Sequence, residues 1–360
     1  MMKLIVAAML ALAAPAAAAP AAPAAPLRVT LDAESARGVL KALANPALTR
    51  EEALALARLP GNAGLIRKVL SYDRPADEAK LADALLAAAK GGSGGDVDAN
   101  YRFVGVRDNA AAIGETLDYL ADPAILADVR TRILAFTPAR VRGEVGGYLI
   151  AGGTSGGFAF DEPKFYLNVA MFPSAPLART ILAHELYHGV QQLAAASRKP
   201  AAGAAACRAK LPGGANLARL FDSLLQEGAA SYVGDVLALP AGDAPVEEAR
   251  KRSQRGVNMI GRSVTLLRLS THALATDPEA DYDAIYGLGF YGDEILYPLG
   301  YVMARAIVAE GGDAALAELI DRPGAEFVTR YAALKAYGGK DAPALDKATL
   351  ERARALAACG

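Results

Sequence analysis

The chain has 360 residues, which is enough for one large or two ordinary domains with a buried apolar core. Hydrophobic residues make up 53% and charged residues 21%, a composition typical of a soluble, globular and mainly helical protein and not of a disordered one. The 38 Lys and Arg nearly balance the 39 Asp and Glu, so the formal charge is −1. This balance argues against nucleic acid or an anionic membrane as a partner, because the chain as a whole has no cationic field to hold either.

The first twenty residues have the three parts of a secretory signal. Lys3 supplies a short positive region, an apolar stretch covers residues 4–14, and small residues at 17–19 fit a cleavage site. We therefore expect residues 1–19 to be removed and a linker at 20–26 to lead into a secreted or periplasmic protein. An uncleaved anchor is the alternative. No later segment is apolar for long enough to predict a membrane span after signal removal.

The next organising feature is a Gly-rich break at 91–96. Helical apolar spacing from 27 to 90 predicts an N-terminal helical region before it, and a second region is expected over 97–345, followed by a C-terminal helix at 346–360. The break marks the candidate domain boundary, although a surface loop within one domain would have the same composition.

Within 97–345 the pattern changes from helical to strand-like and back. Apolar and other residues alternate over 165–172, which predicts a strand that closes a small sheet at 145–172. Helices are expected at 109–121, 123–136, 177–197, 215–238, 248–275 and 291–310. The predicted fold class is α+β, predominantly helical, with the small sheet preceding the long helix at 177–197.

Two cysteines, Cys207 and Cys359, are present. An exported chain meets an oxidising compartment in which two thiols commonly pair, so one long-range disulfide and two free thiols are equally weighted expectations. Two cysteines cannot form a cysteine-based zinc site by themselves.

The segment HELYH at 184–188 has the residue types and spacing of a metal-binding motif. His184 and His188 are four residues apart on a helix and share one face, so both imidazoles can reach one metal ion. Glu185 projects beside them, where it can contact a water on the metal without binding the metal. Leu182 and Leu186 lie on the opposite side, which gives the helix a core face and a ligand face. Two surface histidines on an amphipathic helix are the alternative interpretation.

A catalytic zinc takes a third protein ligand and keeps one position for water. The metzincin pattern would add a His six residues beyond the second His, but that position is Ala194, which excludes the class. Glu227 lies on the apolar stripe of its helix, and a metal would give a buried carboxylate a partner. Gly228 beside it has no side chain, so we expect two helices to approach each other closely there. An ordinary salt-bridged Glu is the alternative, with Asp222 and Asp235 as weaker ligand candidates.

HExxH followed by a helix with EGAAS resembles the gluzincin metallopeptidases, in particular the peptidase-MA-like zinc-dependent peptidases of bacteria. The upstream strands and the stretch LYPLGYVMARAI extend the similarity over roughly residues 100–310. The resemblance implies a zincin-like catalytic core that uses Zn²⁺. It implies zinc ligands at His184, His188 and Glu227 and a general base at Glu185. The chain departs from the thermolysin-like pattern at Ser231, where that pattern has Asp, so a partner for a ligand imidazole is not identified.

The expected function is an exported zinc-dependent peptidase that acts on peptides or proteins, with Glu185 moving the proton of the attacking water to the leaving amine. The developing oxyanion needs a hydrogen-bond donor. Candidates are Tyr291, Tyr297, Tyr301 and His272, of which the G-Y-x-M-A resemblance favours Tyr297 or Tyr301. The alternative for each tyrosine is a packing aromatic side chain, and for His272 it is an ordinary surface histidine.

Substrate binding and two other functions complete the expectations. The strand at 165–172 is expected to bind extended peptide by strand addition, with a plain core strand as the alternative. An exported helical protein that binds zinc without turnover would have the same motif, and so would a zinc hydrolase of a non-peptide amide bond. Zinc content without hydrolysis of any peptide would favour the non-catalytic protein.

Overall fold

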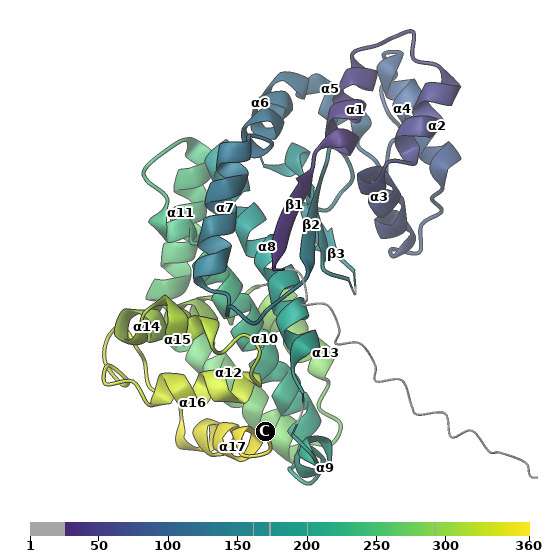
Figure 1. Cartoon of the computed structure of the whole chain (residues 1–360). Helices are drawn as coiled ribbons and strands as arrows, with labels where there is room; N and C mark the ends of the chain where they lie inside the picture. Colours follow the sequence, from purple (N-terminus) through teal and green to yellow (C-terminus); the bar gives the residue numbers. More distant parts are fainter. Residues whose placement is uncertain (1–25, 161, 173, 200, 292) are drawn as a thin grey trace, which may run out of the picture.

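The computed structural model describes residues 26–160, 162–172, 174–199, 201–291 and 293–360 (Figure 1). The expected signal at 1–19 and nearly all of the expected linker lie outside the described residues. Helices dominate, and one four-stranded sheet accompanies them, as the predicted α+β class requires. Among the described helices, none combines the length and apolar character that crossing a membrane would need.

The sheet has the strand order β1, β2, β4, β3. β1 (Arg28–Asp32), β2 (Glu144–Ile150) and β4 (Lys164–Asn168) run parallel, and β3 (Gly157–Ala159) pairs antiparallel with β4. The expectation that residues 27–90 are helical from their start is wrong, because β1 opens that region. Its partner β2 lies more than a hundred residues further along the chain, so the local sequence around β1 does not indicate the pairing.

The strand predicted at 165–172 is shorter than expected and is not an edge. It ends at Asn168, whose side-chain oxygen accepts a hydrogen bond from the backbone N–H of Ala170 and starts a 3-10 turn at Val169–Met171. β2 pairs with β4 over its whole length, and β3 pairs with it from Phe165 to Leu167. A peptide therefore cannot add to β4 along the paired residues, and the edges of the sheet are β1 and β3.

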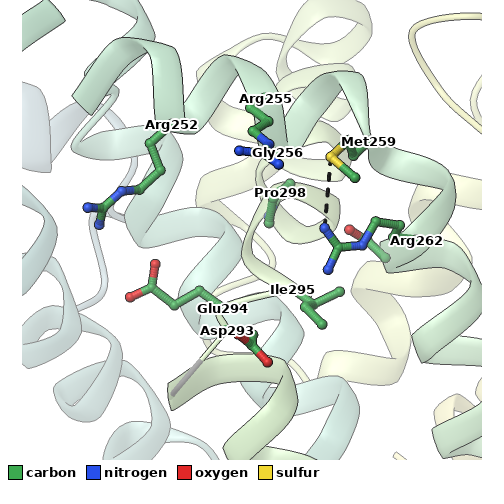
Figure 2. Close-up of a pocket in the computed structure, with 10 residues that line it drawn as sticks. Arg252, Arg255, Gly256, Met259, Arg262, Asp293, Glu294, Ile295 and Pro298 are labelled. Atoms are coloured by element: carbon green, nitrogen blue, oxygen red, sulfur yellow. Dashed lines mark hydrogen bonds between the residues drawn. The ribbon is translucent and has the colours of Figure 1, made fainter. Parts of the chain in front are cut away.

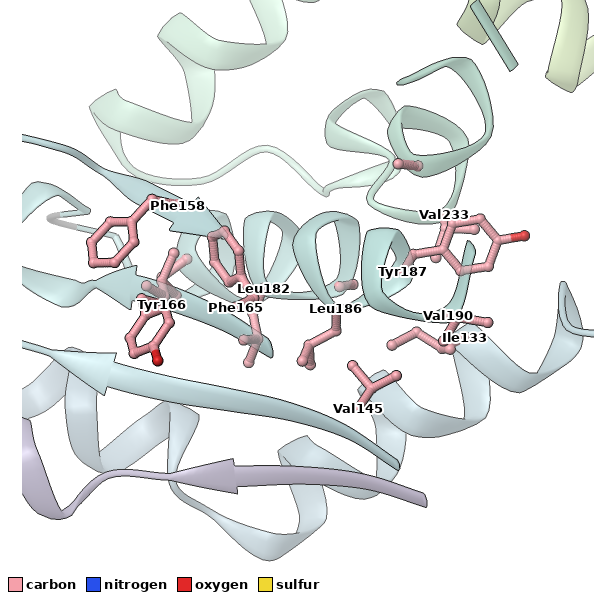
Figure 3. Packing of buried hydrophobic residues seen from close by; sticks show 14 of the residues in the cluster. Ile133, Val145, Phe158, Phe165, Tyr166, Leu182, Leu186, Tyr187, Val190 and Val233 are labelled. Atoms are coloured by element: carbon pink, nitrogen blue, oxygen red, sulfur yellow. The ribbon is translucent and has the colours of Figure 1, made fainter. Parts of the chain in front are cut away.

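Helices cover both faces of the sheet. α8 (Ala175–Ser197) lies on the face of Val145 and Phe165, where Leu182 and Leu186 point toward the strands (Figure 3). A Cβ on Gly189 would lie 2.6 Å from Val145, so this glycine lets the helix approach β2 closely. α3 (Pro60–Leu70) lies on the other face, where a Cβ on its Gly64 would collide with the ring of Tyr166. The HExxH helix is thus held against the sheet by its apolar side.

The remaining N-terminal elements surround this unit. Thr49 begins one of them with a capping box, in which its hydroxyl accepts from the backbone N–H of Glu52 and the Glu52 carboxylate accepts from that of Thr49. The predicted helices at 109–121 and 123–136 are confirmed. The elements are α1 (Glu34–Leu43), α2 (Arg50–Ala57), α4 (Glu78–Ala89), α5 (Phe103–Asp108), α6 (Ala110–Leu120) and α7 (Pro123–Ala135).

The C-terminal half is helical, with three differences from the predicted bounds. The helix expected at 215–238 ends at Val233, and Val236–Ala238 form a separate 3-10 turn. The helix expected at 248–275 is two helices, because Met259 leaves helical geometry between them. The helix expected from 291 begins at Tyr297, since Pro298 fits only the first turn of a helix. The elements are α9 (Ala204–Ala209), α10 (Gly214–Val233), α11 (Ala244–Asn258), α12 (Ile260–Thr276), α13 (Tyr282–Tyr286), α14 (Tyr297–Gly311), α15 (Asp313–Ala317), α16 (Gly324–Ala332) and α17 (Lys347–Ala357).

Cys207 and Cys359 form a disulfide, which decides between the two expectations for these thiols. Their Cα atoms are 5.5 Å apart, and the bridge joins α9 to the residues after α17 across 152 positions of sequence. A crosslink that closes so long a loop restricts the unfolded chain and so stabilises the fold of the C-terminal half.

Candidate metal centre

The two motif histidines face each other on α8. Their Nε2 atoms are 3.1 Å apart, and the His184 and His188 side chains are 12% and 21% exposed. Glu227 of α10 lies opposite, with its Oε2 3.6 Å from Nε2 of His184 and 3.3 Å from Nε2 of His188. Two helices that are distant in sequence therefore bring three ligand-type atoms to one point.

The surroundings of the Glu227 carboxylate indicate whether a metal ion fits the site. Its Oε2 is buried and has no hydrogen-bond partner among the described residues. A buried carboxylate oxygen without a partner is costly, and a cation would remove that cost. Zinc bonds of 2.0–2.2 Å in tetrahedral geometry place neighbouring ligand atoms about 3.3 Å apart, close to the observed 3.1, 3.3 and 3.6 Å. The donor set of two imidazoles and a carboxylate suits zinc.

A second carboxylate lies at the same site. The ligand-type atoms of His184, Glu185 and His188 all fall within 4.8 Å of one another. Glu185 follows His184 on the helix, so its carboxylate comes from the motif itself, whereas that of Glu227 comes from α10. The geometry thus brings two carboxylates, from two different helices, to the paired imidazoles.

Gln191 orients His188, a role the sequence analysis did not assign. Its side-chain N–H donates to the carbonyl oxygen of Gln226, at 3.0 Å, so its amide oxygen faces Nδ1 of His188 at 2.9 Å. Nδ1 must then carry the proton and donate it, which leaves the Nε2 lone pair free toward Glu227. This amide also ties α8 to the residue before Glu227.

Charge coupling between His188 and Glu227 is strong. Burial lowers the pKa of His188, but the Glu227 carboxylate outweighs it and raises that pKa to about 9. Burial acts to raise the pKa of Glu227, but the two imidazoles, His188 above all, hold it well below its usual range. The carboxylate and the imidazoles thus each stabilise the charged form of the other, and the same geometry favours a cation placed between them.

Of the candidate oxyanion donors, Tyr297 lies closest to the histidines. It begins α14, and its ring lies nearly parallel to that of His184 with the centroids 6.3 Å apart. Burial and the nearby carboxylates, first that of Glu227, raise its pKa far above the ordinary value, so the phenol keeps its proton and can donate it in a hydrogen bond.

The other candidates have different surroundings. The Tyr301 hydroxyl donates to the carboxylate of Asp235, 3.1 Å from each oxygen, so both residues are engaged with one another. Asp222 accepts from the backbone N–H of Gly324 at 2.6 Å. Tyr291 is 78% exposed. His272 is exposed on α12. None of these five side chains has a hydrogen bond or ion pair with either imidazole among the described residues, whereas Glu227 lies within 3.6 Å of both.

Backbone contact between α10 and α14 positions Glu227 and Tyr297 together. A Cβ on Gly228 would lie 2.5 Å from the carbonyl carbon of Gly300, and a Cβ on Gly300 would lie 2.7 Å from the Gly228 Cα. The prediction that Gly228 permits a close helix approach is confirmed. Each glycine is one turn or less from a site residue, so this contact sets the distance between the two sides of the site.

The site consists of two imidazoles on an HExxH helix that face a buried carboxylate from a second helix. This arrangement is typical of the metal centre of a zinc peptidase. A family model described as "Putative zinc dependent peptidase (DUF5700)" matches residues 55–336. The chain belongs to this zinc-dependent family, as the resemblance predicted. No curated protein and no solved structure matches the chain.

Proposed function

We propose that the chain is an exported zinc peptidase of gluzincin type. His184, His188 and Glu227 hold the zinc ion in this proposal, and Glu185 is the general base. The observation that carries it is the buried Oε2 of Glu227, which has no hydrogen-bond partner among the described residues and lies 3.3 and 3.6 Å from the two imidazole Nε2 atoms. The family's description as a zinc-dependent peptidase supports the same chemistry.

Bound zinc supplies polarisation of the scissile carbonyl and a lowered pKa for the attacking water. With zinc in place, Glu185 would accept a proton from the attacking water and deliver it to the leaving amine nitrogen. Tyr297, which stays protonated, donates a hydrogen bond to the developing oxyanion. Gln191 keeps the Nδ1 proton of His188 in place, so the Nε2 atom stays directed at the metal position.

Loss of an imidazole tests the zinc site directly. His188→Ala is expected to abolish stoichiometric zinc, because only two of the three protein ligands remain. Elemental analysis of the purified protein after dialysis measures the zinc per chain. His272→Ala is the matched control, since this third histidine is exposed on α12, and it should retain one zinc. Full zinc content in His188→Ala would refute the ligand assignment.

Export is the second part of the proposal. The signal-like start supports it, and the Cys207–Cys359 disulfide is typical of proteins that fold in an oxidising compartment. We expect protein isolated from its native host to begin near residue 20, as read by N-terminal sequencing of the secreted or periplasmic fraction. An intact N-terminus on protein from the cytosolic fraction would contradict export.

A further inference from the structure

A cavity of about 140 Å³ lies between α11, α12 and the segment that leads into α14 (Figure 2). Arg252, Arg255 and Arg262 line it from the two helices. Asp293 and Glu294 line it from the opposite segment. We name this cavity the arginine pocket. The apolar parts of its wall include the side chains of Met259, Ile295 and Pro298.

The arginines of this pocket belong to a strongly basic stretch. Residues 249–276 contain six cationic side chains and no acidic one. None of the six forms an ion pair within 4 Å among the described residues. Inside the pocket, three guanidinium groups outnumber two carboxylates, neither of which is ion-paired. A chain with a net charge of −1 thus concentrates unpaired positive charge at one cavity.

The pocket shares the first turn of α14 with Tyr297. Pro298 lines it and directly follows Tyr297, whose ring lies beside His184. A Cβ on Gly256 would lie 2.6 Å from Pro298, so α11 packs on the first turn of α14. A peptide that runs from the paired imidazoles past Tyr297 and along the start of α14 would therefore meet the pocket.

We propose that the arginine pocket binds a carboxylate of the peptide substrate and makes the enzyme selective for acidic peptides. This rests on the proposed peptidase function. A guanidinium group matches a carboxylate with two parallel N–H donors, and the apolar wall suits the methylene groups of a Glu side chain. The carboxylate can come from an Asp or Glu side chain or from the C-terminus of the peptide.

Matched peptides distinguish the two sources. One set carries a single Glu, or its isostere Gln, at successive positions around the scissile bond, with both termini blocked. A second set has Gln throughout and ends in either a free carboxylate or an amide. We expect kcat/KM to be roughly tenfold higher for the carboxylate member of one set, the effect of one charge-assisted hydrogen bond. Equal rates within both sets would overturn the proposal.

Variants locate the effect in the pocket. Arg255→Gln and Arg262→Gln should each remove most of the preference for the carboxylate peptide. Arg268→Gln is the matched control, because Arg268 is an exposed cation of α12 that does not line the pocket, and it should retain the preference. A preference that survives both pocket substitutions, or that is lost equally in Arg268→Gln, would show a diffuse charge effect and overturn the assignment.

Binding separates this inference from the proposed catalysis. Fluorescence anisotropy of labelled Glu and Gln peptides with the Glu185→Gln protein measures affinity without turnover. We expect tighter binding of the Glu peptide, weakening with salt and absent when Arg255→Gln is added. If no peptide is hydrolysed by the unmodified chain, the peptidase proposal fails, and this binding difference alone decides whether the carboxylate pocket stands. Equal binding of both peptides overturns it.

Discussion

Glu185→Gln is expected to lower peptide hydrolysis by at least about 10²-fold while the protein keeps one zinc per chain. The substitution preserves the size of the side chain and its capacity for hydrogen bonds but removes the basic carboxylate. The two imidazoles and Glu227 are untouched, and their ligand atoms stay 3.1–3.6 Å apart. The loss should therefore be in kcat, because proton transfer in the transition state fails while substrate still binds.

Glu227→Gln is the matched substitution for this experiment. Both changes convert a carboxylate of the same site into an amide, but only Glu227 is expected to be a zinc ligand, so only its variant should lose zinc. The experiment has to distinguish the ligand from the base, because Glu185 also lies within 4.8 Å of both imidazoles. Loss of zinc from Glu185→Gln would make Glu185 a ligand. Full activity with full zinc content would place hydrolysis elsewhere and end the gluzincin proposal.

Hydrophobic periodicity predicted most helices because each helix buries one stripe of its own local sequence. The long helix with HELYH, predicted at 177–197, is α8 at Ala175–Ser197. β1 was missed for the opposite reason. Its five residues pair with β2, for example Arg28 opposite Glu144, and such a long-range partner leaves no periodic signal in a short strand. The edge position of β3 likewise depends on pairing and not on local pattern.

At the site, sequence could name candidates but not choose between those that share a helix face. Tyr297 and Tyr301 are four residues apart on α14, so periodicity treats them alike. Asp235 lies just after the end of α10 and accepts a hydrogen bond from the Tyr301 hydroxyl. Tyr297 instead lies beside His184. For Gln191 the sequence does carry one signal, because Gln191 lies three residues after His188 and so on the same face of the predicted helix. Its burial and its contact with His188 are visible only in the structure.

Gly228→Ala is expected to destabilise the protein by on the order of 3 kcal/mol and to remove most of its activity. The added methyl would lie 2.5–2.6 Å from three backbone atoms of Gly300, and backbone cannot rotate away as a side chain can. α10 and α14 must therefore separate. Glu227 is the neighbouring residue on α10, and Tyr297 begins α14. Displacement by about 1 Å at such a site can cost 10²-fold in rate.

Thermal unfolding, zinc content and peptide hydrolysis measure these effects, the last below the unfolding midpoint so that folded protein is compared. Gly114→Ala is the matched control, because its Cβ on α6 would meet no atom within 4 Å. That variant should be unchanged or up to about 1 kcal/mol more stable, as for Gly replaced by Ala inside an open helix.

Gly300→Ala introduces a methyl group at the same contact from the other side. We expect the Gly228→Ala, Gly300→Ala double variant to be less destabilised than the sum of the two single variants, because the first methyl already separates the helices. Additive losses would mean that the two glycines do not share one contact, and the close approach of α10 and α14 would not be what holds Glu227 and Tyr297 together.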